Sequence, residues 1–100
     1  MTKQFKTLGG MLRSVKATLK RDGYKLSSQG EYRYTSGLLV TGNEWDLITI
    51  EQINIKGHQV DVVDVPELLE LLKDYNAYLK IETFSHDRST LKTIRIKFNK

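Results

Sequence analysis

The chain has 100 residues, of which 39% are hydrophobic, so it suffices for one domain with a single core and is too short for two ordinary domains. It contains no Cys, which excludes a disulfide framework, a thiolate nucleophile and a Cys-ligated zinc site. Neither a signal-peptide-length apolar run nor the roughly 20 apolar residues of a membrane span occur. We therefore expect a single soluble, cytoplasmic domain over residues 1–100, without membrane contact.

The net charge of +4 conceals a strong segregation along the chain. Residues 1–35 carry eight Lys and Arg against two acids, a net of +6, whereas residues 36–87 carry three against ten, a net of −7. Residues 88–100 carry five Lys and Arg and no acid. Two basic ends with an acidic middle indicate a binding protein that meets an anionic partner on one face.

Residues 3–21 have the period of an amphipathic helix. Phe5, Leu8, Leu12, Val15 and Leu19 recur at steps of three and four, which places them on one stripe. Gly9-Gly10 weakens the first turns, because each Gly costs about 1 kcal/mol relative to Ala in a helix interior. A helix that begins near Gly10 would leave residues 1–8 as a basic arm. Asp22-Gly23 is expected to end the helix.

Strand patterns dominate the segment after this helix. Residues 31–40 are aromatic and β-branched, residues 41–44 form a turn cluster, and residues 45–55 read as a strong strand. The apolar phase of that strand changes at Glu51-Gln52, which predicts a bulge or a break. A second turn at residues 56–58 leads to a third strand that contains Val60, Val62 and Val63.

The second helix has the clearest local signal in the chain. Asp64 is expected to cap it, Pro66 fits its first turn and Glu67 can reach back to the cap. Asn76 is its expected stop. Its apolar side is wide enough for core packing or for a dimer contact, and core packing is favoured; this side consists of Leu68, Leu69, Leu71, Leu72 and Tyr75.

A hairpin completes the chain. Residues 78–84 and 90–98 are its strands, with the turn at residues 85–89, and Ile94, Ile96 and Phe98 alternate with Thr93, Arg95 and Lys97. The element order is α-β-β-β-α-β-β. Short turns favour antiparallel pairing, so we predict a small two-layer α+β domain with helices on one face of a mainly antiparallel sheet. Its predicted core includes Leu69, Leu72, Ile94 and Ile96.

A basic surface is the first candidate site. Lys6, Arg13 and Lys20 recur every seven residues, so that they form a stripe opposite the apolar one and can meet successive anions. A solvated face that only keeps the protein soluble is the favoured alternative. The full candidate surface includes both basic ends and consists of Lys6, Arg13, Lys16, Lys20, Arg33, Arg95 and Lys97.

Tyr32 and Tyr34 form a candidate base-stacking pair. They alternate on one strand beside Lys25 and Arg33, and stacking combined with cations is typical of sequence-tolerant single-strand binding. Core packing of that strand face explains them better. No RNA-recognition signature of the Lys/Arg-Gly-Phe type accompanies them.

Catalytic and metal motifs find little support in the sequence. His86-Asp87 is a dipeptide of some metal-dependent phosphohydrolases, but a site would need further ligands and His58 is the only other His. His58 with Asp61 and Asp64 would make a weak cluster at most. There is no Gly-x-Ser-x-Gly elbow, phosphate loop or dinucleotide fingerprint. We expect no enzyme activity, no cofactor and no metal.

The sequence thus favours a small non-enzymatic binding module or inhibitor that docks on a protein of nucleic-acid machinery, by an exposed strand edge or by the acidic middle. Small proteins of this style are common in phages and mobile elements, where some inhibit host defence nucleases. The alternative is a direct, sequence-tolerant nucleic-acid-binding protein that uses the basic first helix and last strand. These two functions differ in one respect: the second gains if both basic regions share a face.

Overall fold

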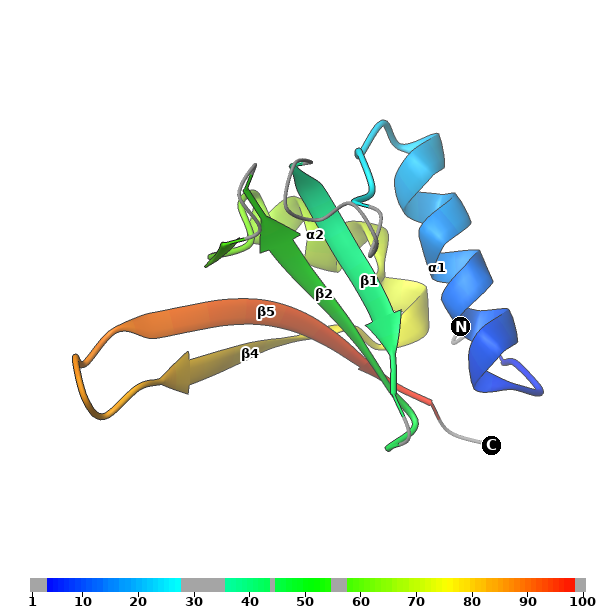
Figure 1. Cartoon of the computed structure of the whole chain (residues 1–100). Coiled ribbons are helices and arrows are strands. Elements are labelled where there is room, and N and C mark those ends of the chain that lie inside the picture. The colour runs from blue at the N-terminus through cyan, green and yellow to red at the C-terminus, as the bar shows by residue number, and fades with distance from the viewer. Residues whose placement is uncertain (1–3, 28–35, 44, 55–57, 99–100) are drawn as a thin grey trace.

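The computed structural model describes residues 4–27, 36–43, 45–54 and 58–98. Two helices and a five-stranded antiparallel sheet follow one another in the predicted order, which confirms the α+β class (Figure 1). A one-turn 3-10 helix, η2, follows the second helix. The elements are α1 (Leu8–Arg21), β1 (Gly37–Gly42), β2 (Leu47–Ile53), β3 (Gln59–Val60), α2 (Val65–Leu71), η2 (Lys73–Tyr75), β4 (Tyr78–Thr83) and β5 (Thr90–Lys97).

The sheet has the strand order β1-β2-β5-β4. β1 pairs with the whole of β2, whereas the other edge of β2 is shared: residues 47–50 pair with β5 and residues 52–53 pair with β3. β5 pairs with β4 over its first six residues, Thr90 to Arg95. As a result, the outer part of the β4–β5 hairpin projects beyond the rest of the sheet (Figure 1).

The core lies between the helices and one face of the sheet. Ile48 pairs with Ile96 and Ile50 with Ile94, so these four fully buried side chains share one face. α1 and α2 both cover this face, α1 along β1 (Figure 1). The helices contribute Met11, Val15, Leu19, Leu68 and Leu72 to the same buried cluster. Burial of such large apolar side chains contributes about 1.5–3 kcal/mol each.

Both ends of α1 are capped by local residues. Thr7 is the N-cap, and its Oγ1 accepts a hydrogen bond of 3.1 Å from the Gly10 N–H. At the other end Gly23 adopts φ 93°, and the N–H groups of Gly23 and Tyr24 donate to Lys20 O and Leu19 O. This is the Schellman arrangement that the Asp22-Gly23 signal predicts. The helix begins at Leu8, and Phe5 packs on the core, so residues 5–8 do not belong to a free arm.

α2 begins where the sequence predicts, but by a different mechanism. Asp64 has φ 54° in the left-handed region and its side chain makes no capping hydrogen bond, so the predicted capping box is wrong. Pro66 does occupy the first turn, where its missing N–H is not needed. α2 itself ends at Leu71, and the predicted stop at Asn76 is the end of η2, where Asn76 adopts the left-handed conformation.

β2 corrects the predicted strand of residues 45–55. The strand begins at Leu47, because Asn43 Oδ1 accepts hydrogen bonds from the N–H groups of Trp45 and Leu47 and so closes a turn. Trp45 lies in this turn and is 76% exposed. The pairing with β1 runs through Glu51 and Gln52 without a bulge. The apolar phase instead changes where the strand paired with this edge of β2 changes from β5 to β3.

Two further predictions of buried residues need adjustment. The third strand is limited to Gln59–Val60, and the two valines that follow it diverge: Val62 is buried and Val63 is exposed. Leu72, Ile94 and Ile96 are fully buried as predicted, whereas Leu69 is half-buried and packs against the core from its margin. The final hairpin and the alternation along β5 are confirmed.

Candidate basic surface

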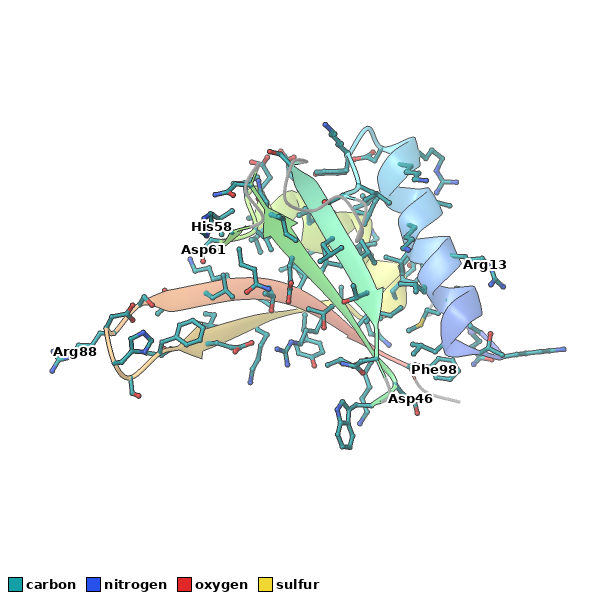
Figure 2. The ribbon with its side chains drawn as sticks, viewed as in Figure 1. Arg13, Asp46, His58, Asp61, Arg88 and Phe98 are labelled. Carbon is teal, nitrogen blue, oxygen red and sulfur yellow. The ribbon has the colours of Figure 1, made fainter. Side chains whose placement is uncertain are left out.

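The outward side of α1 carries the predicted basic stripe. Met11, Val15 and Leu19 face the sheet, so Arg13 and Lys20 lie on the opposite side of the helix and are exposed. Seven residues of helix separate them by about 10 Å. Lys6 is exposed just before the N-cap, outside the helix itself. Figure 2 shows Arg13 directed away from the sheet.

Lys16 lies at the border between this stripe and the sheet. It is half-buried and, with Lys20, lines a surface hollow of about 240 Å³ between α1 and β1. The other wall comes from the segment before β1: Ser27 N–H donates to Leu38 O, and Leu38 N–H donates to Lys25 O. A small anionic group that entered the hollow would meet two ammonium groups.

The α1 cations face no carboxylate within the described part of the chain. The ion pairs there join Lys73 to Glu70 and Arg95 to Glu82, His86 Nε2 lies 3.6 Å from Asp87 Oδ2, and none of these contacts includes a cation of α1. Helix α1 itself contains no acid. Within the described residues, the cations of α1 thus form no ion pair. We call the exposed side formed by Lys6, Arg13, Lys16 and Lys20 the α1 basic face.

Arg95 and Lys97 do not join the α1 basic face. Their neighbours Ile94 and Ile96 point into the core beneath the helices, so Arg95 and Lys97 point to the opposite face of the sheet. Arg95 and Lys97 therefore lie on the side of the sheet opposite the cations of the first helix. Within the described residues, these two cations thus do not extend the α1 cations into a single basic patch.

Arg95 is also held by a partner. Its Nη2 lies 2.7 Å from Glu82 Oε1, and its side chain is only one-quarter exposed. The register places Glu82 opposite Leu91, so the Arg95 side chain runs along β5 across Thr93. Thr93, which lies between Leu91 and Arg95 on that face, is 1% exposed. Arg95 is consequently less available to an external anion than the cations of α1.

An acidic region borders the α1 basic face at its C-terminal end. Burial raises the pKa of the Tyr24 hydroxyl above 10.0, and the nearby negative charges of Glu67, Asp22 and Asp64 raise it further. Asp22 and Glu67 also line a shallow hollow with Pro66, Glu70 and Leu71. The sequence reveals the acids of α2 but not their meeting with Asp22, which depends on how the two helices pack.

The remaining candidates do not form a site in the described structure. Tyr32, Arg33 and Tyr34 lie outside the described residues. His58, labelled in Figure 2, lies directly before β3, whereas His86 belongs to the turn between β4 and β5. Asp61 accepts a 3.0 Å hydrogen bond from the Lys92 N–H. Within the ranges that the structure describes, no three His, Cys, Asp or Glu residues gather to hold a metal ion.

Comparisons with protein-family models, with curated proteins and with solved structures find no match to this chain. No helix in the described part of the chain has the length and apolarity needed to cross a membrane. Inference about function therefore rests on the arrangement of charge, apolar side chains and strand edges.

Proposed function

We propose that this chain is a non-enzymatic cytoplasmic module that docks on another protein, and that its partner works in nucleic-acid machinery. The observation that carries the proposal is that Arg95 and Lys97 lie on the side of the sheet opposite the cations of α1. Cations that lie on two sides favour a local contact with one anionic surface. They are less suited to a continuous path along a polyanion. The α1 basic face is the docking surface, and the partner presents carboxylates to it.

The size of the α1 basic face supports a protein partner. If its four cations contacted four phosphates, the logarithmic salt slope would be about −3.6, and binding would fall about 150-fold between 50 and 200 mM salt. Dedicated nucleic-acid-binding proteins make more phosphate contacts than this. The acids beside Tyr24 would also repel a phosphate backbone that continued past the end of α1. A protein surface of the same size as the α1 basic face is restricted neither by the small number of cations nor by these acids.

Exposed apolar side chains add a second support. Isolated exposed apolar residues are ordinary, but Trp is the residue most enriched among interface hot spots. Trp45 is 76% exposed, and its N–H donates to Asn43 Oδ1. A large exposed indole of this kind offers apolar contact area to a partner.

Direct nucleic-acid binding is the second candidate function. The observation that favours it is the charge of Lys6, Arg13 and Lys20 on one exposed side of α1, where they form no ion pair within the described residues. Binding of this kind would be sequence-tolerant and strongly salt-dependent, because phosphate contacts carry no base information.

The test is a pull-down from the native host, performed with and without nuclease. The chain is compared with the variant Lys6→Glu, Arg13→Glu, Lys20→Glu and with a control of equal charge change on the other basic end, Arg88→Glu, Lys92→Glu, Lys97→Glu. We expect the chain to capture a partner protein with or without nuclease. The control variant should capture the same protein, and the α1 variant should not.

Other outcomes separate the alternatives. Capture that disappears on nuclease treatment, together with salt-sensitive binding of the purified chain to oligonucleotides of any sequence, would establish the second candidate. Capture that is equal for both variants would exclude the α1 basic face. Circular dichroism of both variants shows whether the fold is retained.

A further inference from the structure

The outer edge of β4 is free of any strand partner in the described structure. β4 ends the strand order β1-β2-β5-β4, and it lies in the projecting β4–β5 hairpin (Figure 1). A free edge presents a row of backbone donors and acceptors that another strand can pair with. This inference is independent of the proposed function, because β4 contributes nothing to the α1 basic face.

Two backbone hydrogen bonds determine which groups point outward. Phe84 N–H donates to Ser89 O at 2.8 Å, so the pair of these residues is hydrogen-bonded. Alternation along an antiparallel ladder then assigns the bonds with β5 to Glu82, Lys80 and Tyr78. The carbonyl of Lys92 agrees, because it accepts from Val62 N–H on the far side of β5 and so does not bond Ile81. The outward N–H and C=O groups therefore belong to Leu79, Ile81 and Thr83.

The side chains of this edge read as a self-complementary sequence around Ile81. Lys80 and Glu82 stand one residue on either side of it, on the face of the sheet that carries Arg95. Tyr78 and Phe84 stand three residues on either side, and both are exposed. Ile81 itself is 53% exposed. Lys80 has no carboxylate partner in the described part of the chain.

We propose that a second copy of this chain pairs with β4 in antiparallel register, with the two-fold axis at Ile81. This register sets Ile81 against its counterpart and joins the outward groups of Leu79 to those of Thr83. Each Lys80 then faces Glu82 of the other copy, whose carboxylate also binds Arg95 of its own chain, and each Tyr78 faces Phe84. One strand thus supplies both halves of two ion pairs and two aromatic contacts.

The symmetry of this register is what selects a second copy as the occupant. A two-fold contact places one patch on its own image, so a strand that is complementary to itself closes a dimer and leaves no further edge. In a register shifted by one residue, the contact would need the backbone N–H and C=O of Lys80, which are already bonded to β5. A shift by two would separate both ion pairs. The contact uses one short strand, so the dimer forms reversibly with protein concentration.

Amide hydrogen exchange of the full chain over a concentration series tests the contact. We expect the amides of Leu79, Ile81 and Thr83 to gain protection as the concentration rises, together with dimer mass in sedimentation. The amides of Lys80 and Glu82 serve as internal controls, since their bonds to β5 protect them at every concentration. A monomer with unchanged exchange at millimolar concentration would overturn the proposal.

Two variants locate the contact. Ile81→Pro removes an outward N–H without removing a bond to β5 and should abolish the dimer. Lys80→Glu places a carboxylate of each copy against Glu82 of the other copy. This repulsion should raise the dissociation constant of the dimer about tenfold or more, without altering the pairing of β4 with β5. Lys73→Glu, an equal charge change on η2, should leave it unchanged. A dimer that survives both β4 variants would place the interface elsewhere and refute the β4 edge.

Discussion

The hydroxyl oxygen of Tyr75 lies 2.7 Å from Ser14 Oγ and thereby joins η2 to α1 across 61 residues of sequence. The same hydroxyl lies 2.9 Å from Thr18 Oγ1, and the Tyr75 ring stacks on Phe5 with centroids 5.9 Å apart. These contacts fix how the two helical segments sit beside each other on the sheet. They therefore fix the position of the α1 basic face and of the acids that border it.

We expect Tyr75→Phe to lower the free energy of unfolding by about 1–2 kcal/mol, because it removes one buried hydroxyl and leaves Thr18 with fewer partners. The ring and its stacking on Phe5 are retained. Urea denaturation measures the effect. Tyr78→Phe is the matched control, since Tyr78 is 44% exposed and should show no change. Equal stabilities of the two variants would mean that the Tyr75 hydroxyl does not hold α1 in place.

Leu72→Ala should lower the free energy of unfolding by about 2–5 kcal/mol. Leu72 is fully buried at the end of α2, where a cavity would be left among the core side chains. This is a large part of the stability of a small domain. Thermal melting monitored by circular dichroism measures it, with the exposed Val63→Ala as control. A Leu72→Ala melting temperature equal to that of the control would contradict the packing of α2.

Much of this fold is present in the periodicity of the sequence. α1 and β5 can be predicted from the regular spacing of their apolar residues. Each element buries one side, so the sequence pattern and the packing agree. The turn at Trp45 and the continuity of β2 through Glu51 are harder to predict. An apolar run gives no information about which strand lies on either side, and at Glu51 it is the neighbour that changes.

The candidate site was predictable only in part. A helical period is enough to place Arg13 and Lys20 opposite the core, and it succeeds. Whether Arg95 lies on their side depends on how the helices cover the sheet, and its capture by Glu82 depends on the register of β4 and β5. Both are long-range properties. No local pattern contains them.

Tyr24 is expected to ionise above its ordinary pKa of 10.0, because burial and the charges of Glu67, Asp22 and Asp64 disfavour the phenolate. The difference in tyrosinate absorbance between the chain and Tyr24→Phe isolates its titration. Glu67→Gln should move the pKa toward 10.0. Because the folded pKa is raised, the associated stability is present below pH 10.0 and is lost as the pH rises through the folded pKa. A Tyr24 pKa at or below 10.0 would show that these acids are not close to it.

The double change His58→Ala, His86→Ala should leave folding and partner binding intact. Both side chains are exposed, and the described structure does not gather ligands around either of them. The pull-down with the native-host extract measures binding, and a chelator should have no effect on it. Loss of binding in a folded double variant, restored by an added divalent metal, would instead assign a metal site to this chain.

The strand order described above also bears on how fast the chain can fold. β1 with β2, and β4 with β5, are hairpins whose strands are close in sequence, and such hairpins form in about 1–10 μs. The pairing of Ile48 with Ile96 instead joins residues 48 positions apart. This long loop must close before the contacts between β2 and β5 can stabilise the chain. We therefore expect the pairing of β2 with β5 to be the slow step of folding. Substitutions at Ile50 and Ile94, which lie in this β2–β5 pairing, should therefore alter the refolding rate more than substitutions in β1 or β4, which lie outside it.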